Sequence, residues 1–300
     1  MAIHALAWRG DTPVDPSAGF GPRQGDRAVF HGDFAVVYPE RGTSARVFEG
    51  GEPLREIPRA EYHAEDYDYP VAIGSVDGRD VLVHCPEEYN RLEIDDLRTG
   101  ERLTAGERTP EDCFHSRLSI SPDGRHLLVA GWVWHPYGIV QVFDLRKALT
   151  DPAHLDGAGV LPMSPGLDAE VASACWLDAD RVAVATNEET LHDEDGDGPD
   201  VDVQTLAVWS LSRAGWISVV RTAEALGTIF ARSGEEVLAL HGHPRVLRVA
   251  TAEVTGAWPE VEVPTRDGAF GVTHMESAVA AVRADGRMAV ASGPEIVALG

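Results

Sequence analysis

The stretch HSRLSISPDGRHLLVAGWVWHPYGIVQVFDLRKAL, residues 115–149, contains the clearest pattern of strands and turns in the chain. Leu118 and Ile120 alternate with polar residues, the turn SPDG follows, and the apolar segments 127–134 and 139–145 flank a glycine-bounded turn. Alternation and short apolar runs between turn residues are typical of β-strands. Pro122 presets φ and Asp123-Gly124 tolerate tight turn geometry, so this stretch predicts a small antiparallel sheet with four strands.

The same order of strand, turn, strand, loop and strand recurs along the chain. VDGR (76–79) and ADGR (284–287) repeat the first turn of the pattern. The repeated units begin near residues 27, 70, 115, 172, 227 and 277. A repeat of roughly 50 residues is in the range of β-propeller blades, so the repetition predicts a propeller.

These units resemble the WD40-like propeller family. The segments VFDL, IDDL and VWSL end the third strand of three units, and Asp144 and Asp96 occupy the position of the aspartate in the family's motif. In VWSL, Ser210 replaces this aspartate. The resemblance implies an all-β fold built from four-stranded blades, whereas function must be argued from the loops.

We interpret residues 1–300 as a single β-propeller domain. The count is six four-stranded blades, with seven as the alternative if residues 1–26 or 150–170 contain a degenerate blade. The segment AIHALAW, residues 2–8, supplies the fourth strand of the last blade and closes the ring by pairing the two ends of the chain. Helices are expected only as a turn or two in RKALTDPAHL, and residues 190–203 form an acidic hairpin insertion.

The chain carries a formal charge of −24, from 49 acidic and 25 basic residues. Nucleic acids and anionic membrane surfaces are bound by clustered Lys and Arg, so both are excluded as expected partners. Lys147 is the only lysine, a bias typical of GC-rich coding, and no segment reads as a signal peptide or membrane span. We therefore expect a bacterial, cytoplasmic protein whose Cys85, Cys113 and Cys175 are free, buried thiols.

In a propeller, the loops between blades and the turns between the second and third strands emerge on one face. The sequence places most of its unusual residues in these segments: GWVWHPYG (131–138), HCPEEYNR (84–91), HGHPR (241–245), AEYHAEDYDYP (60–70) and TPEDCFH (109–115). The predicted binding residues on this face are Tyr67, Tyr69, Tyr89, Trp134, His135, Tyr137, His241 and His243. Trp132, by contrast, is expected to pack inside.

Rigid aromatic rings on loops are typical of recognition surfaces, because they supply contact area at little entropic cost. Acidic residues lie among these rings in the sequence, including Glu65, Asp68, Glu111 and Asp112. The first prediction is therefore a non-catalytic module that binds a protein or peptide, in the manner of a scaffold or an inhibitor. If the acidic residues of this face contact the partner, the partner is expected to be basic.

The acidic insertion contains the pattern of a calcium loop. Asp193, Asp195 and Asp197 precede Gly198 in the D-x-D-x-D-G order that brings carboxylates to one ion. The later ligand is missing, since Gln204 stands where an EF-hand has glutamate. A solvated hairpin tip is thus the alternative to calcium, and no other cofactor is expected.

The alternative function is a hydrolase or lactonase-like enzyme with a metal-assisted site at the mouth of the channel. Glu65, Asp68, Glu111, Asp112 and the histidines are its candidate residues, and His241 and His243 project to the same side if extended. Sequence motifs for a serine nucleophile or a phosphate loop are missing.

Overall fold

A computed structural model describes residues 6–16, 25, 27–134, 137–163, 166–190, 201–265 and 278–300. The chain is all-β, as predicted, and helix is confined in these residues to short segments such as α1 (Leu145–Thr150) and the 3-10 turn η2 (Pro152–Leu155). Both lie in RKALTDPAHL, where the sequence predicts a turn or two. No helix in the described part of the chain is long and apolar enough to cross a membrane.

The chain divides into two compact units. We call them the N-terminal unit, residues 16–135 and 141–162, and the C-terminal unit, residues 1–15, 136–140 and 163–300.

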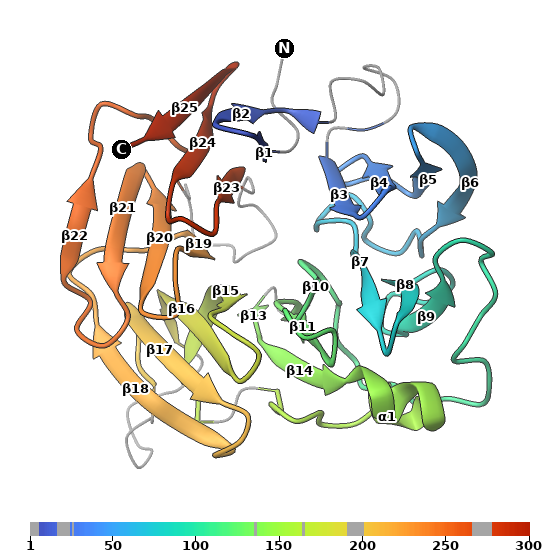
Figure 1. The fold of residues 1–300 in the computed structure, drawn as a ribbon. Coiled ribbons are helices and arrows are strands. Elements are labelled where there is room, and N and C mark those ends of the chain that lie inside the picture. Colours follow the sequence, from blue (N-terminus) through green and yellow to red (C-terminus); the bar gives the residue numbers. More distant parts are fainter. Residues whose placement is uncertain are drawn as a thin grey trace. The chain divides into compact units, whose positions relative to one another are not determined.

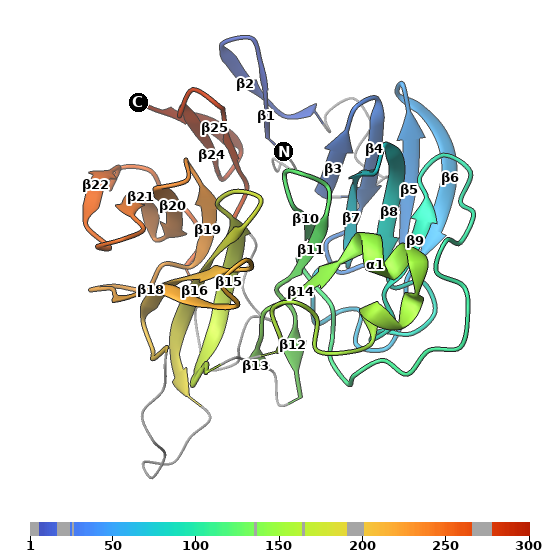
Figure 2. The same ribbon diagram turned by 60° about the horizontal axis from the view of Figure 1, so that its bottom comes forward.

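The N-terminal unit contains three antiparallel sheets, which Figure 1 shows in blue, cyan and green. The first sheet consists of β3 (Arg27–His31), β4 (Phe34–Tyr38), β5 (Ser44–Glu49) and β6 (Glu52–Pro58). The second consists of β7 (Val71–Val76), β8 (Arg79–His84) and β9 (Glu93–Asp96). The third consists of β10 (Ser119–Ile120), β11 (His126–Val129) and β14 (Gln141–Asp144), and α1 follows it directly (Figure 2). The short strand β12 (Trp132–Val133) also belongs to this unit.

The C-terminal unit repeats this plan. Its first sheet is β15 (Ala169–Trp176), β16 (Arg181–Thr190), β17 (Thr205–Ser210) and β18 (Gly215–Arg221). Its second is β19 (Thr228–Ala231), β20 (Glu236–His241), β21 (His243–Arg248) and β22 (Val254–Ala257). Its third is β23 (Ala280–Val282), β24 (Met288–Ser292) and β25 (Glu295–Leu299). The unit also holds β13 (Tyr137–Gly138) and the hairpin of β1 (Ala7–Arg9) and β2 (Thr12–Val14).

The first strands of successive sheets lie against one another within each unit. β7 contacts both β3 and β10, and β19 contacts both β15 and β23. Between the sheets lie apolar layers, such as the one that joins Val81 and Val83 of β8 to Leu127 and Phe143. Stacking neighbouring sheets through their inner strands is the packing of a propeller, in which each blade buries the face of the next.

Turn chemistry accounts for the hairpins that the sequence predicts. In VDGR, Asp77 and Gly78 both have positive φ, 51° and 79°, as a two-residue type I′ turn requires. In SPDG, a Cβ on Gly124 would lie 2.0 Å from the carbonyl oxygen of Ser75 in the neighbouring sheet. Only glycine fits this position, so the turn both closes its own hairpin and seats it on β7.

The residues that the resemblance marks share one structural role. Asp144 accepts hydrogen bonds from the backbone N–H groups of Arg146 and Lys147 and caps α1. Asp96 likewise accepts from the N–H of Thr99 at 2.8 Å, which lowers the pKa of this carboxyl. The hydroxyl of Ser210 accepts from the N–H three residues later at 3.3 Å, so serine replaces the aspartate with the same contact.

Each four-stranded sheet has a β-bulge between its third and fourth strands. The register shifts fall between Val47 and Phe48, Val208 and Trp209, and Val246 and Leu247. Bulges twist an edge strand away from further pairing. The outer strands β6, β18 and β22 are therefore protected against edge-to-edge association.

Of the segment AIHALAW, which is predicted to pair with the last blade, residues 2–5 lie outside the described residues. β1 pairs with β2 rather than with the last sheet, and in the described residues no strand pair joins β1 to β23–β25. The hairpin instead rests on that sheet through side chains: the Trp8 indole donates to the Ala281 carbonyl at 3.4 Å, and Arg287 and Arg283 lie 2.7 and 3.0 Å from Asp11. β2 and β25 are in contact (Figure 1).

The segment predicted as an acidic hairpin insertion, residues 190–203, begins at the last residue of β16 and ends before β17. Residues 191–200 lie outside the described residues, and with them the calcium candidates Asp193, Asp195 and Asp197. The calcium loop remains a prediction.

Candidate functional site

A stack of aromatic rings in the N-terminal unit joins four segments of the chain. Phe114 is its centre: the ring lies 3.8 Å from Trp132 with an interplanar angle of 8°, and 4.4 Å from Tyr89 at 24°. Tyr62 continues the series at 6.0 Å from Phe114 and 16°. Phe114 and Trp132 are buried, so the inner end of the stack is part of the core, as predicted for Trp132.

The outer end of the stack is exposed. Tyr62 is 55% exposed and Trp134 is 59% exposed, the two largest values for large apolar side chains among the described residues. His63 lies between them, at 4.5 Å from Tyr62 and 5.0 Å from Trp134. We call Tyr62, His63, Tyr89 and Trp134 the aromatic patch.

Close backbone approach brings Trp132 onto Phe114. The two residues exchange both backbone hydrogen bonds, at 2.8 and 3.0 Å. A Cβ on Gly131 would lie 2.2 Å from the Phe114 carbonyl oxygen, so the first glycine of GWVWHPYG permits this contact. The glycine thus positions a ring stack rather than only a chain reversal.

The loop 60–70 is held by contacts on several sides. His63 has φ of 54°, its carbonyl accepts from the N–H of Asp66 at 2.9 Å, and its ring lies 2.7 Å from the Asp66 carboxylate. Arg59 donates to the Tyr67 carbonyl at 3.2 Å and stacks on the ring of the same tyrosine at 4.1 Å. These contacts fix the positions of Tyr62 and His63 before any partner binds.

Three of the expected binding residues are core residues, which corrects the prediction that their rings face a partner. Tyr67 and Tyr69 are 2% exposed, and burial raises the pKa of both phenols. Tyr69 donates to the Ile57 carbonyl at 3.0 Å, and Tyr67 packs against Phe114 at 5.4 Å. Tyr137, in the C-terminal unit, is 5% exposed and donates to the Asp168 carbonyl at 2.9 Å. The Tyr69 and Tyr137 hydroxyls suit burial because each donates to a backbone carbonyl, whereas the buried Tyr67 hydroxyl has no hydrogen-bond partner among the described residues.

Acidic side chains adjoin the patch. The Tyr89 hydroxyl donates to Asp112 at 2.6 Å, and this bond raises the pKa of Tyr89 to about 12. Glu111 accepts from Asn90 through its backbone and from Gln141 through its carboxylate, at 3.2 and 3.4 Å. Both acids are exposed, so the patch carries negative charge at its edge.

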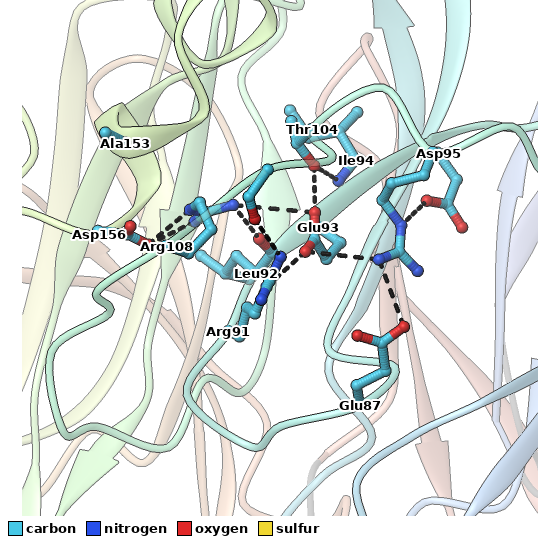
Figure 3. A network of polar contacts seen from close by, with 12 residues as sticks. Glu87, Arg91, Leu92, Glu93, Ile94, Asp95, Thr104, Arg108, Ala153 and Asp156 are labelled. Atoms are coloured by element: carbon cyan, nitrogen blue, oxygen red, sulfur yellow. Dashed lines mark hydrogen bonds and ion pairs between the residues drawn. The ribbon is translucent and has the colours of Figure 1, made fainter.

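A buried polar network holds the loop that leads to Glu111 and Asp112 (Figure 3). Glu93 is fully buried and lies 2.6 Å from Arg91 and 3.8 Å from Arg108. Arg108 in turn pairs with Asp156 at 2.6 Å, and the same carboxylate accepts from the Thr109 N–H at 2.7 Å. Through these contacts, the segment of Arg108 and Thr109, which precedes Phe114 in the chain, is attached to β9 and to the end of η2.

The network was not anticipated from the sequence. Arg108 and Asp156 are 48 positions apart and neither belongs to a recognisable motif. In the sequence, Arg108 stands at the end of a polar loop. Such a position predicts an exposed side chain rather than a buried ion pair. Phe114 was also missed as a separate candidate, although its loop was singled out.

Cys113 and His115 lie together beneath the patch. The Cys113 sulfur is 3.7 Å from a ring nitrogen of His115 and 3.6 Å from the Gln141 side-chain oxygen. Burial raises the pKa of Cys113 to about 12 and lowers the pKa of His115 to about 4, so both are neutral near pH 7. An activated cysteine requires a lowered thiol pKa, and this pair has the opposite.

The remaining candidates do not assemble into a metal centre in the described residues, where no group of three His, Cys, Asp or Glu side chains could hold an ion. His241 and His243 are register partners at the end of the β20–β21 hairpin, where Gly242 between them has a φ of 71°. His135 lies outside the described residues. Glu65 is exposed and Asp68 is half-buried in loop 60–70.

No protein-family description and no curated protein matches the sequence. Solved structures match the fold. One is titled the mitotic checkpoint complex, with TM-score 0.58 and 11% identity over 91% of this chain and 74% of the other. Another is the Pan2 WD40 domain of Neurospora crassa, with TM-score 0.51 and 13% identity over 89% and 71% of the two chains. The chain therefore has a WD40-like β-propeller fold, as the repeats predict.

Proposed function

We propose that the chain is a non-catalytic module that binds a protein or peptide through the aromatic patch. The observation that carries this proposal is the exposure of Tyr62 and Trp134 on a buried ring stack. Exposed large rings on a rigid support are typical of the energetic centre of protein interfaces. The stack fixes the rings, so little conformational entropy is lost when a partner covers them.

We further propose that the partner is basic. Exposed carboxylates of Glu61, Glu65, Glu111 and Asp112 lie in the loops that carry the rings, and the whole chain has a charge of −24. Negative charge speeds association with a positive partner and disfavours acidic ones. The similarity of the fold to WD40 propellers also supports a general role as an interaction scaffold.

We also propose six blades closed through the chain termini. Six sheets of three or four strands in the described residues support the number, and the contacts of the β1–β2 hairpin with β25 and β23 support the closure. Deleting residues 1–15 is expected to lower the melting temperature markedly, because the contacts of Asp11 with Arg283 and Arg287 and the cover over the last sheet are lost. An unchanged melting temperature would argue against closure.

Selection of peptides from a random display library tests the binding function. Peptides enriched on the full chain are expected to lose binding to Trp134→Ala and Tyr62→Ala. Leu54→Ala is the matched control, because Leu54 is another exposed apolar side chain of the same unit, on the outer strand β6. Failure to enrich any peptide, or equal binding to all three variants, would contradict the proposal.

A further inference from the structure

We propose that the aromatic patch binds an arginine side chain of its partner, in preference to lysine. This inference rests on the proposed function of the same surface and adds the chemistry of the group that it recognises. Three features of the N-terminal unit support it: the orientation of the rings, the place of one carboxylate, and the rigidity of the support.

The rings of Trp132, Tyr89 and Tyr62 each lie within 24° of the plane of Phe114, while Tyr62 and Tyr89 are tilted by 40° to each other, and the series ends at solvent. The interplanar angles to Phe114 are 8° for Trp132, 24° for Tyr89 and 16° for Tyr62. Because more than half of Tyr62 is exposed, a further planar group can lie on the series from outside. A guanidinium is planar and stacks on aromatic faces, whereas an ammonium is a compact and strongly hydrated charge.

Asp112 places a carboxylate at the edge of the same rings. Its Oδ1 atom accepts from the Tyr89 hydroxyl at 2.6 Å, and the rings of Tyr89 and Tyr62 are 5.1 Å apart. The carboxylate is exposed, and among the described residues its second oxygen accepts no hydrogen bond. A guanidinium has five N–H donors in its plane, so it can stack on a ring and donate to a carboxylate beside that ring at once.

The support under the patch is fixed before binding. His63 is held by Asp66 and separates Tyr62 from Trp134, while Arg59 packs on the inner ring Tyr67. Asp112 follows a loop that the buried Arg108–Asp156 ion pair attaches to the unit. The geometry therefore favours a side chain of one shape rather than any cation.

The test uses capped pentapeptides of glycine with a central arginine, lysine or citrulline. Citrulline keeps the planar shape without the charge, and lysine keeps the charge without the plane. Binding to the full chain is followed through the indole N–H signals in NMR titrations, with the Trp134 signal identified from Trp134→Phe. The arginine peptide is expected to bind at least about fivefold more tightly than either of the others.

Two variants separate local from general electrostatics. Asp112→Asn removes the charge but retains an acceptor for Tyr89, and it is expected to weaken arginine binding about fivefold. Glu52→Gln changes the net charge equally on the outer strand β6 and is expected to leave binding within about twofold.

Equal binding of the arginine and lysine peptides, or an equal effect of the two variants, would show that the patch responds to charge alone and would overturn the inference. Absence of arginine binding would overturn it as well. In either case the proposed function would survive if library peptides still required Tyr62 and Trp134, so the two failures are distinguishable.

Discussion

Trp132 and Trp134 are two positions apart and their rings are in contact at 5.8 Å, yet the first is 2% exposed and the second 59%. Strand alternation puts both on one side of the chain. β12 ends at Val133, however, so Trp134 already belongs to the turn and its ring extends beyond the stack. The alternation therefore predicts the side on which a ring lies, whereas the length of the strand decides whether the ring is covered.

This difference divides one aromatic cluster into two roles. Phe114 and Trp132 contribute buried area and hold four segments of the chain together, whereas Tyr62 and Trp134 leave their area available to a partner. If the division is correct, stability and binding respond to different substitutions in the same cluster.

The largest effect is expected for Trp132→Ala. The substitution removes a fully buried ring that stacks on Phe114. Large-to-small changes of buried aromatic residues cost about 3–5 kcal/mol of stability. Urea denaturation followed by circular dichroism measures the loss. A decrease in the free energy of unfolding below about 1 kcal/mol would show that the Trp132 ring is not needed for stability, and would contradict the division of the cluster into two roles.

The next effect is a dependence of stability on pH that comes from His115. Burial lowers the pKa of its imidazole from 6.5 to about 4, so the unfolded chain binds a proton more readily than the folded chain. Stability from this residue is therefore complete above about pH 6.5 and is lost as the pH falls toward 4. The full difference corresponds to about 3 kcal/mol.

Denaturation curves between pH 7 and pH 4 check this expectation against His115→Gln. Glutamine can still donate to the Asn90 carbonyl, which the ring nitrogen of His115 contacts at 3.0 Å, but it does not titrate. The variant should lose less stability on acidification than the natural chain. Parallel curves for the two proteins would mean that His115 contributes nothing to the slope.

The sequence predicts the repeated part of the fold because the signals there are local. Asp77-Gly78 and the SPDG turn need particular φ values or close approach, and Asp144 and Asp96 cap the segment that follows a third strand. Apart from the approach of Gly124 to Ser75 of the neighbouring sheet, these requirements involve residues close in sequence. The β1–β2 pairing was not predicted, because a hairpin within residues 7–14 competes with pairing to a sheet far along the chain.

The site could be predicted only by region. The loops around residues 60–70, 84–91 and 131–134 supply the aromatic patch, and loop 109–115 supplies the buried Phe114. Tyr67 and Tyr69, however, turn inward toward Arg59. Which tyrosine of a loop is covered depends on contacts with distant chain segments, such as Phe114 for Tyr67. Composition and spacing contain no information on those contacts.

A smaller effect is expected for Tyr137→Phe. Tyr137 was expected to meet a partner, but its buried hydroxyl donates to the Asp168 carbonyl at 2.9 Å. Removing one such hydrogen bond while keeping the ring costs about 1 kcal/mol. Thermal denaturation should show the decrease, and peptide binding by the variant should match that of the natural chain. Loss of binding at unchanged stability would return Tyr137 to the binding surface.

The smallest effect on stability is expected for Trp134→Ala, within about 0.5 kcal/mol, because the substitution removes a side chain that is largely in water already. Its ring contacts are with His63 at 5.0 Å, Trp132 at 5.8 Å and Phe114 at 6.4 Å, and these neighbours keep their other partners. The same urea measurement that detects Trp132→Ala checks this value, so the two tryptophans serve as controls for each other. A loss of more than about 2 kcal/mol would place Trp134 in the core. The ring would then be retained for folding, and the exposed half of the cluster would no longer be available for recognition of a partner.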